Sequence, residues 1–302
     1  MSELVIETKG LTKEFGSLTA VKDLNLKVKK GALYGFLGAN GAGKSTTIRM
    51  LLDLVKPTRG NAYLFNKDIR YHRKEILRKV GAMVESPSYY ENLTAYENLE
   101  IIRRILKLEK KEIDKALEIV NLSKWKDKRV KTFSLGMKQR LGIAQVLMGD
   151  RELLILDEPT NGLDPAGVRE IRNLIISLPE ITGATVLISS HILSEIELIA
   201  DHVGIIHNGK LLFQGTLEEL KEMGNREIAI KAQPLLEAEK FLRNKGYDVE
   251  MREGRLYITA ERINIEEVNR EMVLEGFGVS HLSENKKKLE EVFLQMTGGI
   301  EG

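Results

Sequence analysis

The clearest chemistry in this sequence lies in eight consecutive residues, 38–45, which read Gly-Ala-Asn-Gly-Ala-Gly-Lys-Ser. The three glycines of this run allow the backbone to wrap closely around a phosphate, with its N–H groups pointing inward. Lys44 supplies a cation for the outer phosphates, and the hydroxyl of Ser45 is a ligand for Mg²⁺. The run fills every fixed position of a phosphate-binding loop (P-loop), and it predicts binding of a nucleoside triphosphate.

A pair of acidic residues follows a second apolar run, Leu-Leu-Ile-Leu at 153–156. If that run is a buried strand, it delivers Asp157 at its carboxyl end, where the carboxylate can hold Mg²⁺ through water opposite Ser45. Glu158 can orient the attacking water or accept its proton, a role that typically contributes ~10²–10⁴-fold in rate. An acid pair after a strand also fits an ordinary turn or helix start. Together with the P-loop, it favours triphosphate hydrolysis.

The elements around these residues are expected to alternate. The apolar run 33–37 predicts a buried strand before the P-loop, and 46–54 predicts a helix whose N-terminus adds partial positive charge beneath the phosphates. Strands that alternate with helices around a P-loop predict a parallel sheet wrapped by helices, an α/β fold. The further elements expected in this part are helices at 135–148, 165–177 and from 193, and strands at 153–156, 185–189, 203–207 and 211–213.

Two other regions complete the predicted organisation. Strands are expected at 4–7, 24–28, 61–65 and 80–84, and amphipathic helices between 95 and 125. Beyond a boundary at 223–225, the expected order is strand, helix, strand, strand, helix, strand, which is typical of a ferredoxin-like α+β module. Its elements are expected at 228–232, 235–244, 248–252, 255–259, 264–274 and 277–282, with a last helix at 286–296. The predicted domains are therefore 1–222 and 226–302.

Composition narrows the functional class. The 302 residues contain 46 basic and 44 acidic residues, a formal net charge of +2, which gives no sign of a nucleic-acid surface. There is no cysteine, so disulfides and thiolate metal sites are excluded. No apolar run approaches the roughly 20 residues needed to span a bilayer, and the N-terminus lacks signal-peptide features. We expect a soluble chain whose contact with a membrane goes through a partner.

A further run, Phe-Ser-Leu-Gly-Met-Lys-Gln-Arg at 133–140, lies between the P-loop and the acid pair. It resembles the signature of the ATP-binding cassette (ABC) superfamily, with Ser134, Gly136, Gln139 and Arg140 in register. A serine hydroxyl and N–H groups at a helix N-terminus can bind phosphate, although most such serines are simply helix caps. The resemblance implies that Ser134 and Gly136 contact ATP held by a second copy of the chain, so that two subunits enclose two ATP molecules.

Other motifs of this superfamily follow in order. Asn-Gly-Leu-Asp at 161–164 resembles the D-loop, which implies that Asp164 lies at the subunit interface. His191 resembles the switch histidine that contacts the γ-phosphate, and Phe15 resembles the aromatic residue that stacks on adenine. A packed core aromatic is the alternative for Phe15. The P-loop residues expected to contact the nucleotide are Gly38, Asn40, Gly41, Gly43, Lys44, Ser45 and Thr46.

The sequence departs from the superfamily pattern at two places. Glu85 stands where glutamine is usual, so it keeps an oxygen ligand for Mg²⁺ but adds negative charge near the phosphates; a solvent-facing acid is the alternative. Leu135 and Met137 stand where glycine and glutamine are usual, and Leu135 must therefore adopt an ordinary φ. Both departures resemble the ATPases of bacitracin- and lantibiotic-type exporters, as does the ending Leu-Glu-Glu-Val-Phe-Leu at 289–294.

The resemblance implies an ATPase core that combines a parallel sheet with an antiparallel β subdomain and a helical insert. It also implies an ATPase subunit that uses ATP and Mg²⁺, forms a homodimer and drives export through a separate polytopic membrane permease. That permease would dock between Glu85 and a helical insert at about 86–130, which places the chain at the cytoplasmic face of the membrane. Import is an alternative, as is a non-transport ABC ATPase that acts on ribosomes or DNA. A P-loop kinase would leave the signature and His191 unexplained.

Overall fold

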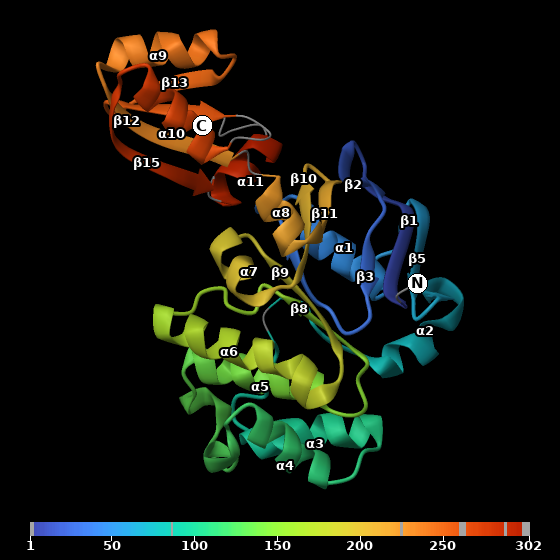
Figure 1. Cartoon of the computed structure of the whole chain (residues 1–302). Coiled ribbons are helices and arrows are strands. Elements are labelled where there is room, and N and C mark those ends of the chain that lie inside the picture. The colour runs from blue at the N-terminus through green and yellow to red at the C-terminus, as the bar shows by residue number, and fades with distance from the viewer. Residues whose placement is uncertain (1–2, 86, 224–225, 260–263, 287–288, 298–302) are drawn as a thin grey trace. The chain divides into compact units, whose positions relative to one another are not determined.

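The computed structural model describes residues 3–85, 87–223, 226–259, 264–286 and 289–297. The chain forms two compact units, Met1–Leu217 and Glu218–Gly302, which are described separately below. The division falls inside helix α8 (Leu217–Glu222), a few residues before the boundary expected from the sequence. Figure 1 shows the elements of both units.

The first unit is built on a six-stranded sheet in the order β11-β10-β4-β9-β8-β7. Its strands β10, β4, β9, β8 and β7 are parallel to their neighbours, and β11 is antiparallel to β10. Because the sheet is covered on both faces, its central strands β4, β8 and β9 are buried at every position. The strands are β4 (Leu33–Leu37), β7 (Val80–Met83), β8 (Leu153–Asp157), β9 (Thr185–Ser190), β10 (His202–His207) and β11 (Lys210–Thr216).

A second, antiparallel sheet belongs to the same unit and has the order β2-β1-β5-β6, with β3 paired to β1. Its strands share a core with helix α1 (Lys44–Leu51), in which Ile48 and Leu51 are fully buried. The strands are β1 (Leu4–Phe15), β2 (Leu18–Leu24), β3 (Lys27–Lys29), β5 (Arg59–Leu64) and β6 (Lys67–Asp68). The expected parallel sheet with an antiparallel β subdomain is confirmed.

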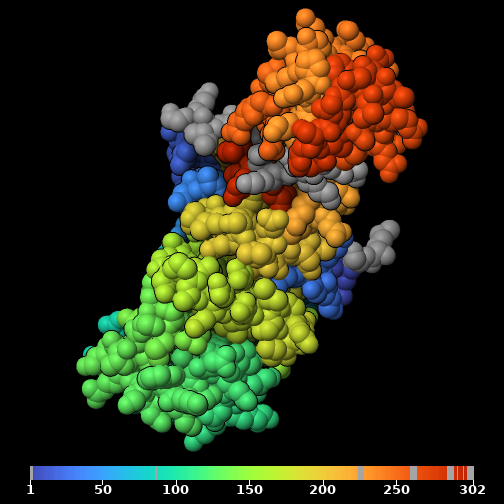
Figure 2. Space-filling model, turned by 60° about the vertical axis from the view of Figure 1, so that its left-hand side comes forward, coloured from blue at the N-terminus to red at the C-terminus, as the bar shows by residue number. Residues whose placement is uncertain are grey.

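A group of helices forms one lobe of this unit, shown in green in Figure 2. Helix α5 (Leu135–Leu147) packs on β7, and α3 (Ala95–Leu106), α4 (Lys111–Ile119) and α6 (Pro165–Thr182) pack on α5. Local sequence explains where these helices begin, because Thr94 and Glu97 form a capping box at α3 and Asp164 caps α6 before a proline. Shorter elements are the turns Ser123–Trp125 and Val130–Thr132 and helix α7 (Leu193–Ile199).

Several boundaries differ from the expectations. Helix α2 (Ile69–Lys79) has no predicted counterpart, because most of its residues are charged or polar and only Ile69 and Ile76 are buried. Helix α6 continues past the expected end at 177, through Pro179, to Thr182, where Gly183 adopts a left-handed conformation.

The second unit has the order strand, helix, strand, strand, helix, strand that the sequence predicts. Its sheet is antiparallel in the order β13-β14-β12-β15, the arrangement of a ferredoxin-like module. The apolar faces of α9 and α10 pack on one face of this sheet, around Ile228, Ile230, Leu256 and Ile258. The elements are β12 (Arg226–Gln233), α9 (Leu235–Asn244), β13 (Asp248–Arg252), β14 (Arg255–Thr259), α10 (Ile265–Leu274), β15 (Gly278–Lys286) and α11 (Leu289–Thr297). The last helix was expected from 286, but that residue ends β15.

Candidate functional site

The P-loop lies between β4 and α1, as the sequence predicts. Gly41 and Gly43 have φ values of +80° and +110°, in the left-handed region that glycine enters without strain. Gly38 has a different reason to be glycine, since a Cβ there would lie 2.4 Å from the carbonyl oxygen of Ile206 on β10. The loop is therefore shaped by backbone geometry that other residues would disturb.

Lys44 begins α1, and its ammonium group is turned back over the loop. Its Nζ donates to the carbonyl oxygens of Gly38 (2.6 Å) and Ala39 (3.1 Å) and lies 3.1 Å from Oε1 of Glu158. Only 5% of the residue is exposed. An ammonium has three N–H donors, and these three acceptors can satisfy all of them. The cation is thus fixed between the loop and the acid pair.

The acid pair follows β8 directly, and β9 supports it. Asp157 is buried and lies in register with Ser189 of β9, whose hydroxyl donates to Oδ1 of Asp157. The same hydroxyl accepts a hydrogen bond from the backbone N–H of Glu158 at 3.0 Å. Glu158 has a φ of +49°, which is unfavourable for a residue with a side chain and of the kind that clusters at functional sites. Ser189 therefore orients both acidic residues.

Glu158 also contacts the predicted switch histidine. Its Oε2 lies 2.6 Å from Nδ1 of His191, which follows β9, while its Oε1 faces Lys44. The carboxylate is only one-fifth exposed. The carboxyl ends of adjacent parallel strands lie at one edge of a sheet, so β4, β8 and β9 bring Lys44, Asp157, Glu158 and His191 together.

The remaining P-loop residues fit a Mg²⁺–triphosphate complex. Ser45 and Thr46 are partly exposed and Asn40 is exposed, whereas the neighbouring Thr47 is buried with its hydroxyl bonded to the Gly43 carbonyl at 2.8 Å. Among the described residues, no group of three or more His, Cys, Asp or Glu is placed to hold a metal ion. Ser45 and Asp157 remain predicted ligands, and so sparse a set is compatible with Mg²⁺, which keeps several waters and takes further oxygens from phosphates.

The signature turn is more open than the P-loop. Ser134 caps α5, accepting a hydrogen bond from the N–H of Met137 at 3.2 Å, so the helix-cap interpretation is correct for the chain alone. Leu135 is helical with an ordinary φ, as expected, and half of its surface is exposed. A Cβ on Gly136 would meet nothing within 4 Å. The predicted D-loop residue Asp164 likewise caps its own helix, accepting from Gly167 at 3.2 Å.

Phe15 ends β1 and is half exposed, with the ammonium of Lys13 4.8 Å from the ring centroid. The alternative of a packed core aromatic is therefore wrong, and the stacking role of Phe15 remains a prediction.

Glu85 follows β7 with a φ of +63°, and its side chain is two-thirds exposed. Its carboxylate pairs with the guanidinium of Arg49 in the last turn of α1. This contact was not predicted, since nothing in the spacing of the two residues indicates it. Its metal-binding role remains a prediction.

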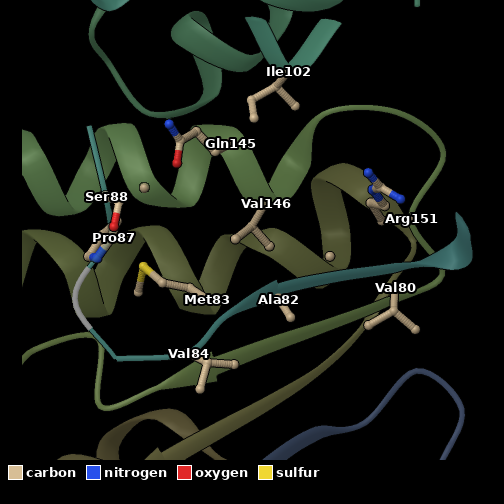
Figure 3. Close-up of a pocket in the computed structure, with 12 residues that line it drawn as sticks. Val80, Ala82, Met83, Val84, Pro87, Ser88, Ile102, Gln145, Val146 and Arg151 are labelled. Carbon is tan, nitrogen blue, oxygen red and sulfur yellow. The ribbon is translucent and has the colours of Figure 1, made fainter. Parts of the chain in front are cut away.

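A cavity of about 350 Å³ lies between β7, α3 and α5, just beyond Glu85. Figure 3 shows Ile102 of α3 and Gln145 and Val146 of α5 around it, with Pro87 and Ser88 at one end and Arg151 at the other. Most of its lining residues are apolar, but polar atoms make up more of the exposed lining surface than apolar atoms do, and Arg151 is the one charged side chain among them. The cavity lies between Glu85 and the helical insert, where the permease is expected to dock.

A P-loop with a strand-end acid pair and a histidine at one sheet edge defines a nucleotide hydrolase of the P-loop class. The sequence pattern of the family described as ABC transporter matches residues 21–161. The chain is 46% identical over 300 residues to the bacitracin transport ATP-binding protein BcrA of Bacillus licheniformis, which covers 98% of each chain. It is 34% identical to the daunorubicin/doxorubicin resistance ATP-binding protein DrrA of Streptomyces peucetius, covering 97% of this chain and 92% of that protein.

Solved structures agree with these similarities. The structure of cbiO1 from Clostridium perfringens, part of the ABC transporter complex cbiONQ, matches with a TM-score of 0.66 and 30% identity over 72% of this chain and 90% of that one. A dimeric ATP-binding cassette, MJ0796, bound to ADP and Pi matches with a TM-score of 0.62 and 25% identity over 70% of this chain and 98% of that one. The chain belongs to the ABC transporter family, as one of its ATP-hydrolysing subunits. Within its described residues, no helix is long and apolar enough to cross a membrane.

Proposed function

We propose that two copies of this chain bind ATP between them and drive export through a separate polytopic permease at the cytoplasmic face of the membrane. The observation that carries the proposal is the cluster of Lys44, Asp157, Glu158 and His191 around the P-loop. Similarity along almost the whole chain to bacitracin transport and drug-resistance proteins supports export over import, with antimicrobial peptides or drugs as the cargo. A net charge of only +2 argues against DNA or ribosomes as partners.

Each residue of the cluster has a distinct role in this proposal. Mg²⁺ bound with the nucleotide supplies positive charge that offsets the phosphates during hydrolysis. Ser45 and Asp157 hold it, with Glu85 as a further oxygen ligand. A triphosphate in the P-loop competes with Glu158 for Lys44, whose Nζ already lies 3.1 Å from that carboxylate. When Lys44 turns to the phosphates, Glu158 is free to accept a proton from water, while His191 keeps its side chain in place.

The second half of the proposed site comes from the second copy. Ser134 and Gly136 lie at the N-terminus of α5, where backbone N–H groups and the helix dipole favour an anion. The open turn around Gly136 leaves space for phosphates held by another subunit's P-loop. Binding of ATP would then close the dimer, and hydrolysis would open it, which converts the reaction into motion of the permease.

The proposed permease contact uses the cavity between β7, α3 and α5. A cavity that presents both apolar and polar surface, with a single cationic residue at one end, suits a short amphipathic helix from a cytoplasmic loop of the permease. Some of the residues that line this cavity are close to Glu85 in the sequence. A partner bound there would therefore act on the segment that leads to the nucleotide site.

The test is a pull-down of the Glu158→Gln protein with ATP and Mg²⁺ from detergent-solubilised cells. The substitution should slow hydrolysis and keep the subunit in its closed, partner-bound state. Recovery of a polytopic membrane protein in stoichiometric amount, absent when the Lys44→Ala protein is used, is the expected result. Recovery of ribosomes or DNA in its place would contradict the transporter proposal and leave the ATP site unaffected.

A further inference from the structure

The segment 87–93 is packed tightly against the signature helix α5. A Cβ on Gly142 of α5 would lie 2.6 Å from Cγ of Pro87, 2.8 Å from the hydroxyl oxygen of Tyr89 and 3.0 Å from Sδ of Met83. Figure 3 shows Pro87 and Met83 beside α5 at one end of the cavity. The glycine at 142 is what permits this close approach, so the segment and the helix are in direct contact.

Tyr89 adds a specific bond to this contact. Its hydroxyl donates to the backbone carbonyl of Lys138, within α5. The N–H of Lys138 in turn donates to the carbonyl of Ser134 at 2.9 Å, so the bond is one helical turn from the signature serine. Burial raises the pKa of Tyr89, which keeps the hydroxyl protonated as a donor. The hydroxyl therefore fastens segment 87–93 to the turn that presents Ser134.

Weaker contacts follow the same path. Nζ of Lys138 lies 2.7 Å from Oε1 of Glu91, and this hydrogen bond lowers the pKa of Glu91. The N–H of Lys131 donates to the Glu91 carbonyl, and that of Val130 to the Leu93 carbonyl, each at 2.9 Å. The ion pair is solvent-exposed, and such pairs contribute little. The Tyr89 bond is part-buried and is the least exposed side-chain contact of the set.

The other end of this region touches the P-loop helix, through the pair between Glu85 and Arg49. A short stretch of chain thus contacts both α1, which carries Lys44, and α5, which carries Ser134 at its cap. In the proposed dimer these helices serve opposite ATP molecules, because Lys44 acts on its own subunit's nucleotide and Ser134 on the partner's.

We propose that Tyr89 is a positioning residue for hydrolysis, and that its hydroxyl fixes the first turn of α5 so that Ser134 can meet the ATP of a second copy. The inference rests on the dimer of the proposed function. Tyr89 touches neither ATP nor Mg²⁺ in this account. Its removal should therefore affect the assembled site while leaving the P-loop of each single subunit as it is.

The experiment compares Tyr89→Phe with its parent in the Glu158→Gln background. The phenylalanine keeps the packing against Gly142 and removes only the hydroxyl. Dimerisation driven by ATP and Mg²⁺, followed by sedimentation velocity, should weaken about three- to tenfold, the range for one net hydrogen bond. Binding of ATP to the monomer should not change. In the otherwise wild-type chain, kcat should fall several-fold without a rise in KM for ATP.

Tyr90→Phe is the matched control, because it removes the same hydroxyl from a side chain that is 64% exposed. The described hydrogen bonds of Tyr90 come from its backbone, including the bond from its N–H to Asn98, and the substitution leaves them in place. It should dimerise like the parent. Dimerisation of Tyr89→Phe equal to the parent would overturn the inference alone. If Tyr89→Phe lowers both the ATP affinity of the monomer and its thermal stability, the role of Tyr89 is merely structural and the inference is also overturned. If the parent itself stays monomeric with ATP, the proposed dimer fails and this inference fails with it.

Discussion

Two surfaces are assigned to ATP: the P-loop with the acid pair beside it, called the P-loop edge, and the signature turn. They differ in how many of their polar groups are hydrogen-bonded within the chain itself. At the P-loop edge, Lys44, Asp157 and Ser189 are each at least 95% buried. The hydroxyl of Ser189 donates to Asp157, and the ammonium of Lys44 bonds to the P-loop backbone and to the residue after Asp157. At the signature turn, Ser134 is exposed and caps its own helix, and a methyl group on Gly136 would meet open space.

This difference indicates that the two surfaces have different partners. Buried polar groups must be bonded within the fold, because an unpaired one is costly, and so the P-loop edge is fixed when the chain folds. An open helix N-terminus with a glycine in its first turn leaves space for an anion from outside. In the proposed dimer, the P-loop edge is therefore the half-site that is complete within the chain, and the signature turn is the half-site that faces a second copy.

The largest expected effect is on the complete half. In Glu158→Gln the base that accepts the proton of water is absent, and kcat for ATP hydrolysis should fall by ~10²–10⁴-fold, measured as phosphate release. ATP binding should persist, because Lys44 and the P-loop are unchanged. Glu109→Gln, an exposed acid on the helical lobe, is the control and should hydrolyse ATP at the normal rate. A fall of less than tenfold in Glu158→Gln would remove Glu158 from the proposed mechanism.

A glycine-to-alanine substitution should lower stability in the P-loop half, whereas in the signature half it should lower activity without lowering stability. Gly38→Ala forces a methyl group against the Ile206 carbonyl and should lower the free energy of unfolding by about 1–3 kcal/mol. Gly136→Ala adds a methyl group to an open helical turn and should leave stability equal or higher by about 0.5 kcal/mol, yet ATP hydrolysis should decrease. Denaturant unfolding and phosphate release measure the two quantities. Full activity in Gly136→Ala would mean that nothing approaches the turn closely.

The sequence predicts the P-loop half well because its elements are strongly patterned. Fully buried strands place Asp157, Glu158 and His191 at one sheet edge, which follows from parallel topology alone. Contacts between separate elements were not predictable, among them the bond from Ser189 to Asp157, the pair of Arg49 with Glu85 and the bond from Tyr89 to Lys138. These depend on register and on close packing at glycines such as Gly142. The ferredoxin-like unit shows the opposite limit, since its order was predictable but no catalytic cluster is evident among its described residues.

A smaller effect is expected at the adenine side of the complete half. Phe15 is half exposed, so Phe15→Ala should leave stability almost unchanged. Loss of one aromatic stacking contact should weaken ATP binding about three- to tenfold. Phe15→Tyr should bind ATP normally. Equal ATP affinity in Phe15→Ala, measured by calorimetry, would exclude a stacking role.

The smallest effect is expected at Glu85. Its negative charge near the phosphates is partly offset by Arg49, so Glu85→Gln should shift the Mg²⁺ requirement of hydrolysis only modestly, toward lower concentrations. Magnesium titrations of the two proteins at fixed ATP measure this shift. Identical titrations would show that Glu85 is a solvent-facing acid that pairs with Arg49 and has no part in the metal site.

The central claim is that each ATP is held by the P-loop of one copy and the signature turn of the other. Lys44→Ala and Gly136→Asp each disable one surface, the second by placing a carboxylate where phosphate should bind. Each protein alone should be inactive. An equimolar mixture should recover about one quarter of wild-type hydrolysis, because half of the dimers are mixed and each mixed dimer has one intact site. An inactive mixture, with dimers of both kinds verified by mass, would show that both surfaces act within a single chain and would contradict the account.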